Sequence, residues 1–151
     1  MSILKKTLIA SAALALPFSV SANAKLEKMM QDPNQWVQQS GNYAGERYTE
    51  LDQINKSNVG SLKVAWTFST GVLRGHEGGP LVIGDVMYVH TAIPNIVYAL
   101  DLNDNQKIIW KYNPVKGGKY PGGETMDRVI SVMCCDNVNR GVNYHPNGTI
   151  V

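Results

Sequence analysis

Short β-prone segments separated by tight turns dominate residues 81–112 and constrain the fold more than any other feature of the sequence. Gly84 and Asp85 separate the first two segments, which is the spacing of a two-residue hairpin. Asn and Asp, which tolerate the left-handed conformation, crowd the turn between the last two. The four predicted strands are residues 81–83, 86–90, 95–102 and 107–112. They predict one antiparallel sheet in an all-β fold, with two faces that need partners.

Further strands are expected on both sides of this sheet. Residues 62–69 combine β-branched and aromatic side chains and stop at Gly71, so they predict a strand. Residues 138–144 predict another strand, followed by a turn and the opening of a further strand at residues 149–151. A natural terminus seldom interrupts a hairpin, so we expect the sequence to be truncated in that strand.

Two segments predict less regular structure. Residues 26–39 are broken by Asp32 and Pro33, so they predict a short helix, a turn and a second short helical piece. Residues 114–131 are rich in glycine and predict a loop that is long enough to lie at a functional rim or over a neighbouring element.

The first 24 residues have the three parts of a secretory signal peptide. Lys5 and Lys6 precede an apolar run at residues 8–20, and the small-residue triplet 22–24 follows. A short membrane anchor is the alternative, but the run falls well below the roughly 20 residues that cross a bilayer. We therefore expect cleavage after residue 24, a periplasmic location and no membrane span afterwards.

The charge and the histidines exclude two kinds of site. The chain has 14 Lys and Arg against 12 Asp and Glu, and removing residues 1–24 takes away two lysines and no acid. The mature chain is then formally neutral, so it lacks the basic field that nucleic-acid binding needs. The three histidines are scattered without zinc-ligand spacing, so structural zinc is not expected.

Cys134 and Cys135 are adjacent and are the only cysteines. Consecutive Cα atoms lie about 3.8 Å apart, below the roughly 4.4–6.8 Å of ordinary disulfides, so a bond between them strains the peptide. Such strain is typical of functional sites. Two free thiols are the alternative, and export to an oxidising compartment favours the bridge. A bridged pair offers a rigid, polarisable face to a flat aromatic ligand.

Two charged residues complete the candidate binding site. Arg140 follows five residues after Cys135, and its guanidinium matches a carboxylate bidentately. Glu77 lies between glycines that let the backbone approach a ligand closely. Taken singly, a surface arginine and a solvated turn acid are the alternatives. Together with the cysteines they predict a site for a planar ligand that carries carboxylates.

Three motifs carry a resemblance to a known family. Two are the segments at residues 75–80 (GHEGGP) and 134–141 (CCDNVNRG). The third consists of Trp36, Gly41, Arg47, Tyr48, Leu51, Gln53, Ile54, Asn55, Asn58, Val59, Leu62, Ala65, Trp66, Thr70 and Gly71. Together they resemble quinoprotein alcohol dehydrogenases, which use pyrroloquinoline quinone (PQQ). The first two are similar to segments of methanol dehydrogenase large subunits in particular, with a lean toward the branch that uses lanthanides.

This resemblance implies an eight-bladed β-propeller, each blade a four-stranded sheet. It divides the chain into a signal peptide (1–24), an N-terminal helical and loop segment (25–61) and a partial propeller (62–151) that holds a closing-blade strand, the first blade and the start of the second. Ala99, Asp101 and Trp110 resemble one copy of the family's blade-docking motif, but the copy is degenerate: Asp104 and Asn105 replace its Thr and Gly, and the tryptophan falls one residue late.

The resemblance also implies roles for the four candidate residues. The Cys134–Cys135 disulfide would stack on the quinone, Glu77 would hydrogen-bond its edge, and Arg140 would bind near a carboxylate or quinone oxygen. The metal, a lanthanide or Ca²⁺, takes its ligands later in the family's chains, as does the catalytic base. We therefore expect no catalytic residue and no metal ligand in this sequence, and no activity from it alone.

The implied reaction is oxidation of methanol, or another small primary alcohol, to an aldehyde, with electrons passed to a periplasmic cytochrome c. The full protein would be a homo-oligomer. Two alternatives stay open: a quinoprotein dehydrogenase for ethanol or other alcohols, and a non-catalytic periplasmic propeller that acts as a scaffold.

Overall fold

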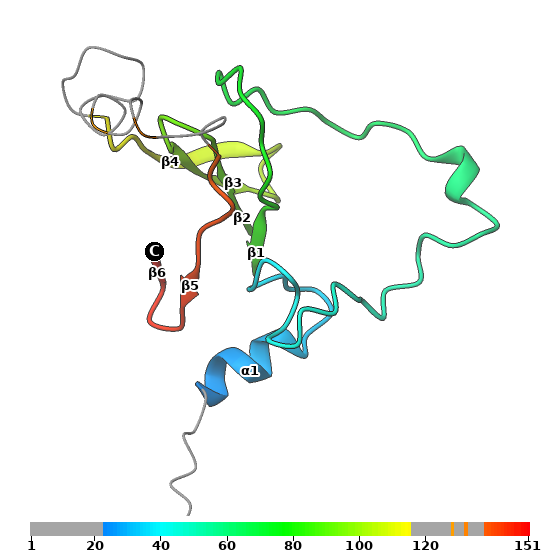
Figure 1. Ribbon diagram of the computed structural model, residues 1–151. Coiled ribbons are helices and arrows are strands. Elements are labelled where there is room, and N and C mark those ends of the chain that lie inside the picture. The colour runs from blue at the N-terminus through cyan, green and yellow to red at the C-terminus, as the bar shows by residue number, and fades with distance from the viewer. Residues whose placement is uncertain (1–22, 116–127, 129–131, 133–137) are drawn as a thin grey trace, which may run out of the picture.

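The computed structural model describes residues 23–115, 128, 132 and 138–151. Its first part consists of helix α1 (Ala24–Met30) and, after a long irregular segment, the 3-10 helix η1 (Val59–Ser61). A four-stranded sheet and a separate two-stranded hairpin follow (Figure 1). Most of the expected signal peptide (1–22) and the pair Cys134 and Cys135 lie outside the described residues. In the part of the chain that is described, no helix has the length and apolar character to cross a membrane.

The sheet contains the four strands that the sequence predicts, in sequence order and antiparallel. Strands β1 (Leu81–Ile83) and β2 (Val86–His90) form the first hairpin, and Ile83 pairs with Val86 across the two-residue turn. Gly84 in this turn has a φ of +57°, in the left-handed region that glycine adopts readily. The first hairpin is therefore confirmed with its expected bounds.

Strands β3 (Val97–Asp101) and β4 (Lys107–Tyr112) form the second hairpin, which contains a β-bulge. Ala99 pairs with Trp110 and Leu100 pairs with Ile108, so Ile109 is an extra residue on β4. The bulge explains why the tryptophan of the docking motif comes one residue late in the sequence. It still lies opposite Ala99, and its ring lies 5.9 Å from that of Tyr88.

Each face of the sheet is covered by a segment from elsewhere in the chain. On one face, Val142 packs against Leu81 and Val97. On the other face, Phe68 and Val72 pack on the cluster around Tyr98 and Leu100. Strand β3 lies between β2 and β4 and is almost entirely buried. These contacts fix residues 138–144 against the sheet, and that placement brings Arg140 toward the start of β1.

The N-terminal segment corrects one prediction. Helix α1 confirms the first helical piece, and the Asn23 side chain caps it. The second helical piece is wrong, because Trp36 instead forms a β-bridge with Val82, with N···O distances of 2.8 and 2.9 Å. Pro33 prevents α1 from continuing, and the bridge then satisfies the backbone groups of Trp36.

Residues 62–69 correct a second prediction, because they form no strand in the structure. They belong to a long segment that runs out from the sheet and returns to it (Figure 1). A strand needs a neighbour for its backbone hydrogen bonds, and no described strand pairs with this segment. Val64 is 80% exposed as a result.

The C-terminal hairpin is confirmed at its turn but is shorter than predicted. Strand β5 (Tyr144–His145) pairs with β6 (Thr149–Ile150), whereas residues 138–143 are extended without forming a strand. Reciprocal backbone hydrogen bonds of 2.8 Å between Asn143 and Val151 continue the ladder by one position. Residues 138–143 are held by side-chain packing and by contacts with Gln39 and His90, described below.

Candidate functional site

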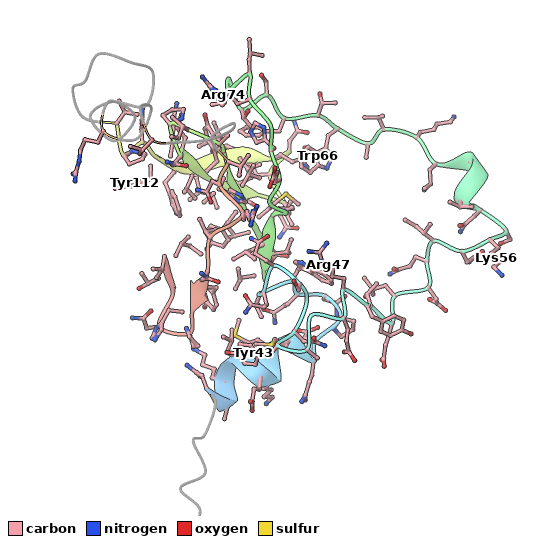
Figure 2. The ribbon with its side chains drawn as sticks, viewed as in Figure 1. Tyr43, Arg47, Lys56, Trp66, Arg74 and Tyr112 are labelled. Atoms are coloured by element: carbon pink, nitrogen blue, oxygen red, sulfur yellow. The ribbon has the colours of Figure 1, made fainter. Side chains whose placement is uncertain are left out.

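An open hollow of about 480 Å³ lies where four separate segments meet. Trp36 is held there by its bridge to β1, and Arg47 lies close to the same region (Figure 2). The other two segments are the glycine-flanked loop before β1 and the extended stretch before β5. The lining residues are Trp36, Gln39, Arg47, Glu77, Gly79 and Arg140.

The structure brings together the two charged residues that the sequence singles out. Arg140 Nε donates to Glu77 Oε2 over 3.4 Å, although 63 residues separate the two in sequence. Both side chains are well exposed, at 83% for Arg140 and 52% for Glu77. An exposed ion pair of this kind adds little stability, so both groups remain available to a ligand.

Backbone contact holds the Glu77 loop against the Arg140 segment more firmly than the ion pair does. A Cβ on Gly78 would lie 2.8 Å from the Arg140 carbonyl carbon and 2.2 Å from His90 Nε2. Neither distance leaves room for a side chain, so glycine is needed for this close approach. Close packing thus explains why a glycine stands at position 78, next to the candidate residue Glu77.

His90 is a structural anchor that the sequence did not reveal. The residue is 4% exposed, its Nε2 lies 3.1 Å from the Asn139 carbonyl oxygen, and its Nδ1 has no hydrogen-bond partner among the described residues. Burial lowers the pKa of His90 below its ordinary value of 6.5; the hydrogen bond to Asn139 opposes this shift, and nearby His76 adds to it. The neutral ring can therefore donate from Nε2 to Asn139.

Asn139 links the same segment to the turn before β3. Its side chain donates to Asn95 Oδ1 over 3.2 Å and accepts from Gly141 N over 3.0 Å. Together with the bond from His90, these contacts fix the backbone immediately before Arg140. Local sequence gives no signal for this role, because the partners lie more than forty residues away.

The site can bind an anion or a flat polar molecule, but the described residues hold no metal centre. The hollow offers a guanidinium fork at Arg140, a second guanidinium at Arg47, a carboxylate at Glu77 and the indole of Trp36. Within the described residues, no group of three or more His, Cys, Asp or Glu side chains could hold a metal ion. The role expected for Cys134 and Cys135 falls outside these residues and stays a prediction.

Most of the chain matches one known protein family. Residues 36–149 match the family described as PQQ: glucose/ethanol/alcohol dehydrogenase, β-propeller domain. The chain belongs to this quinoprotein family. The match to a β-propeller domain confirms the all-β propeller fold predicted from sequence.

Individual relatives of this quinoprotein chain are methanol dehydrogenases. A lanthanide-dependent methanol dehydrogenase of Methylorubrum extorquens is 55% identical over 88% of the chain and 21% of that protein. Methanol dehydrogenase [cytochrome c] subunit 1 of Paracoccus denitrificans is 47% identical over 83% of the chain and 18% of that protein. The chain thus spans about a fifth of the length of these relatives.

A solved structure supports the same relationship. A europium-containing methanol dehydrogenase has a TM-score of 0.72 and 52% sequence identity, over 82% of this quinoprotein chain and 20% of its own. The fold and the sequence therefore agree on the family.

Replacing Gly78 by alanine tests the close approach of the two loops. In the full-length protein we expect Gly78→Ala to lower the free energy of unfolding by about 1–3 kcal/mol, because the new Cβ displaces either the His90 ring or the Arg140 backbone. Denaturant unfolding measures the change. Gly75→Ala in the same loop is the matched control, since its Cβ meets no atom within 4 Å. Equal stability of the two variants would contradict the packing described.

The burial of His90 predicts a pH dependence of stability. A pKa lowered by folding means that the unfolded state binds more protons than the folded state below about pH 6.5. The full-length protein should therefore lose stability as the pH falls through 6.5 toward the folded-state pKa. His90→Gln keeps a donor for Asn139 and removes this titration. Parallel stability curves for wild type and His90→Gln between pH 5 and 8 would count against this explanation.

Proposed function

We propose that the full-length protein oxidises methanol and related primary alcohols to aldehydes with PQQ as the electron acceptor. The observation that carries the proposal is the ion pair of Glu77 and Arg140, which both line one hollow. It occurs in a chain that is 55% identical to a lanthanide-dependent methanol dehydrogenase. Neither residue is a general base here. Both would bind and orient the quinone.

The residues present fit a flat, carboxylate-bearing cofactor. The hollow, of about 480 Å³, falls within the roughly 300–1,000 Å³ usual for small-molecule sites. Arg140 presents donors in a plane that matches a carboxylate or adjacent carbonyl oxygens. Glu77 is its existing partner at 3.4 Å and would accept hydrogen bonds from the ligand's edge. A ligand carboxylate would thus exchange one weak ion pair for a stronger, less hydrated one.

Chemistry and binding are divided between the cofactor and the chain. When bound, PQQ supplies a two-electron acceptor for the hydride that leaves the alcohol carbon, with a lanthanide or Ca²⁺ as the Lewis acid. Glu77 and Arg140 would hold the quinone ring in one plane and would set the charge around it. The alcohol proton would go to a base elsewhere in the full-length protein, and we expect this stretch of chain alone to be inactive.

The adjacent cysteines complete the proposed site. A disulfide between Cys134 and Cys135 would present a stiff sulfur surface to the quinone plane, as polarisable sulfur does toward aromatic rings. Arg140 follows five residues later. The short segment 134–140 would therefore contact the face of the quinone ring through the disulfide and its edge through Arg140.

Location and partners form part of the same proposal. Residues 1–24 would act as a cleaved signal peptide, residues 25–61 as an N-terminal segment and residues 62–151 as the partial propeller, in a periplasmic protein. The name of one relative includes cytochrome c, which supports a periplasmic cytochrome c as the electron acceptor. We propose a homo-oligomer for the full-length protein.

Replacing Arg140 by lysine tests the cofactor site directly. In the full-length apo-protein we expect Arg140→Lys to weaken PQQ binding by about 10–100-fold, because lysine keeps the charge but loses the planar fork. Titration followed by absorbance of the bound quinone gives the affinity. Lys56→Ala is the control, because this residue lies at the far tip of the long loop (Figure 2). Equal affinity for Arg140→Lys and wild type would remove Arg140 from the site.

The cysteine pair calls for a separate experiment. Replacing both Cys134 and Cys135 by alanine should weaken PQQ retention by up to about tenfold and lower dye-linked methanol oxidation. Mass spectrometry of the exported, unreduced protein should find both thiols blocked to alkylation. Free thiols in that protein would refute the bridge. A preference for ethanol or another alcohol would instead favour the related quinoprotein, and failure to bind PQQ would favour the scaffold.

A further inference from the structure

The side chain of Gln39 joins the two loops that carry the candidate cofactor-binding residues. Its Oε1 accepts a hydrogen bond from Gly79 N over 3.1 Å, and its Nε2 donates to the Val142 carbonyl oxygen over 3.4 Å. The two contacts span 40 and 103 residues of sequence. One amide group therefore connects three segments, of which those of Gln39 and Gly79 are also joined by the nearby Trp36–Val82 bridge.

Packing fixes the Gln39 amide in this position. A Cβ on Gly141 would lie 2.4 Å from Gln39 Cδ and 2.5 Å from its Nε2, so the amide occupies the space that any other residue at 141 would fill. Gly141 also has a φ of +148°, which strains other residue types. The absence of a side chain at 141 lets Gln39 reach Val142.

Both residues that this amide contacts lie close in sequence to the candidate pair, Glu77 and Arg140. Gly79 follows Glu77 by two residues, and Val142 follows Arg140 by two residues. Gln39 itself is held in place because Trp36 is bridged to Val82, and because Gln39 lies inside a turn that is closed by the hydrogen bond from Gly41 N to Gln38 O at 2.9 Å. Gln39, Glu77 and Arg140 all line the same hollow.

We infer that Gln39 is a positioning residue that sets the spacing of Glu77 and Arg140 for the quinone. This inference rests on the proposed function for the identity of the ligand. The ion pair cannot set the spacing, because both of its side chains are largely exposed. The two Gln39 hydrogen bonds act on backbone that is half-buried at Gly79 and buried at Val142, and they fix the loops before a ligand arrives. Their loss widens or tilts the site while Glu77 and Arg140 are both retained.

Gln39→Met tests the inference, because methionine keeps the length of the side chain and removes both hydrogen bonds. Two measurements on the full-length apo-protein are needed: hydrogen exchange of the Gly79 amide and the dissociation constant for PQQ. We expect exchange at Gly79 to be about tenfold faster and PQQ binding to be about tenfold weaker, with amides of β2 and β3 unchanged. Gln31→Ala is the matched control, since this exposed side chain makes no hydrogen bond to the described residues; it should alter neither value.

Gln39→Glu is the second variant and keeps the test decisive if Gln39→Met fails to fold. Its neutral carboxyl can accept from Gly79 and donate to Val142, whereas its carboxylate places negative charge against the Val142 carbonyl. PQQ affinity relative to wild type should therefore fall as the pH is raised through the titration of this carboxyl group.

The outcomes separate this inference from the proposed function. Unchanged Gly79 exchange or unchanged PQQ affinity in folded Gln39→Met, or a flat relative affinity for Gln39→Glu across that pH range, overturns the role of Gln39 while wild-type PQQ binding stands. A wild-type protein that fails to bind PQQ overturns the proposed function itself.

Discussion

The burial of strand β3 on both faces of the sheet is the constraint on which the rest of the structure depends. Its side chains alternate between a face covered by Val142 and a face covered by Phe68 and Val72. Because Val142 is anchored there, the residues just before it must pass the start of β1. The meeting of Arg140 with Glu77 is thus a consequence of apolar packing two residues away, and the polar contact itself contributes little to it.

Groups other than the charged pair hold the two loops of the site in place. His90 and Asn139 fix the backbone before Arg140, Gly78 permits the close approach of the opposite loop, and the amide of Gln39 joins the two. Each of these contacts involves buried or half-buried groups, whereas the ion pair is exposed at the surface. Such a division leaves the charged groups free for binding while the loops that carry them stay in place.

Local chemistry explains which parts could be predicted from sequence. The first hairpin depends on Gly84 and its two-residue turn, and the second on turn residues such as Asn105, which has a φ of +50°. Residues 62–69 were predicted wrongly, because a strand exists only where a neighbour accepts its hydrogen bonds. Gln39 and His90 were missed since their partners lie 40 to 103 residues away. Glu77 and Arg140 were predicted through chemistry and family resemblance, which do not depend on local conformation.

The bulge at Ile109 lets strand β4 carry one extra residue without moving its other side chains to the opposite face of the sheet. Side chains alternate along a strand, so one added residue would ordinarily turn every later side chain to the opposite face. Here the addition is confined to a single unpaired position, and Trp110 still stands opposite Ala99 beside Tyr88. Strand β4 can therefore gain or lose one residue at this point while its tryptophan keeps the same neighbours. Insertions and deletions at this position are the kind that a blade can accept without repacking.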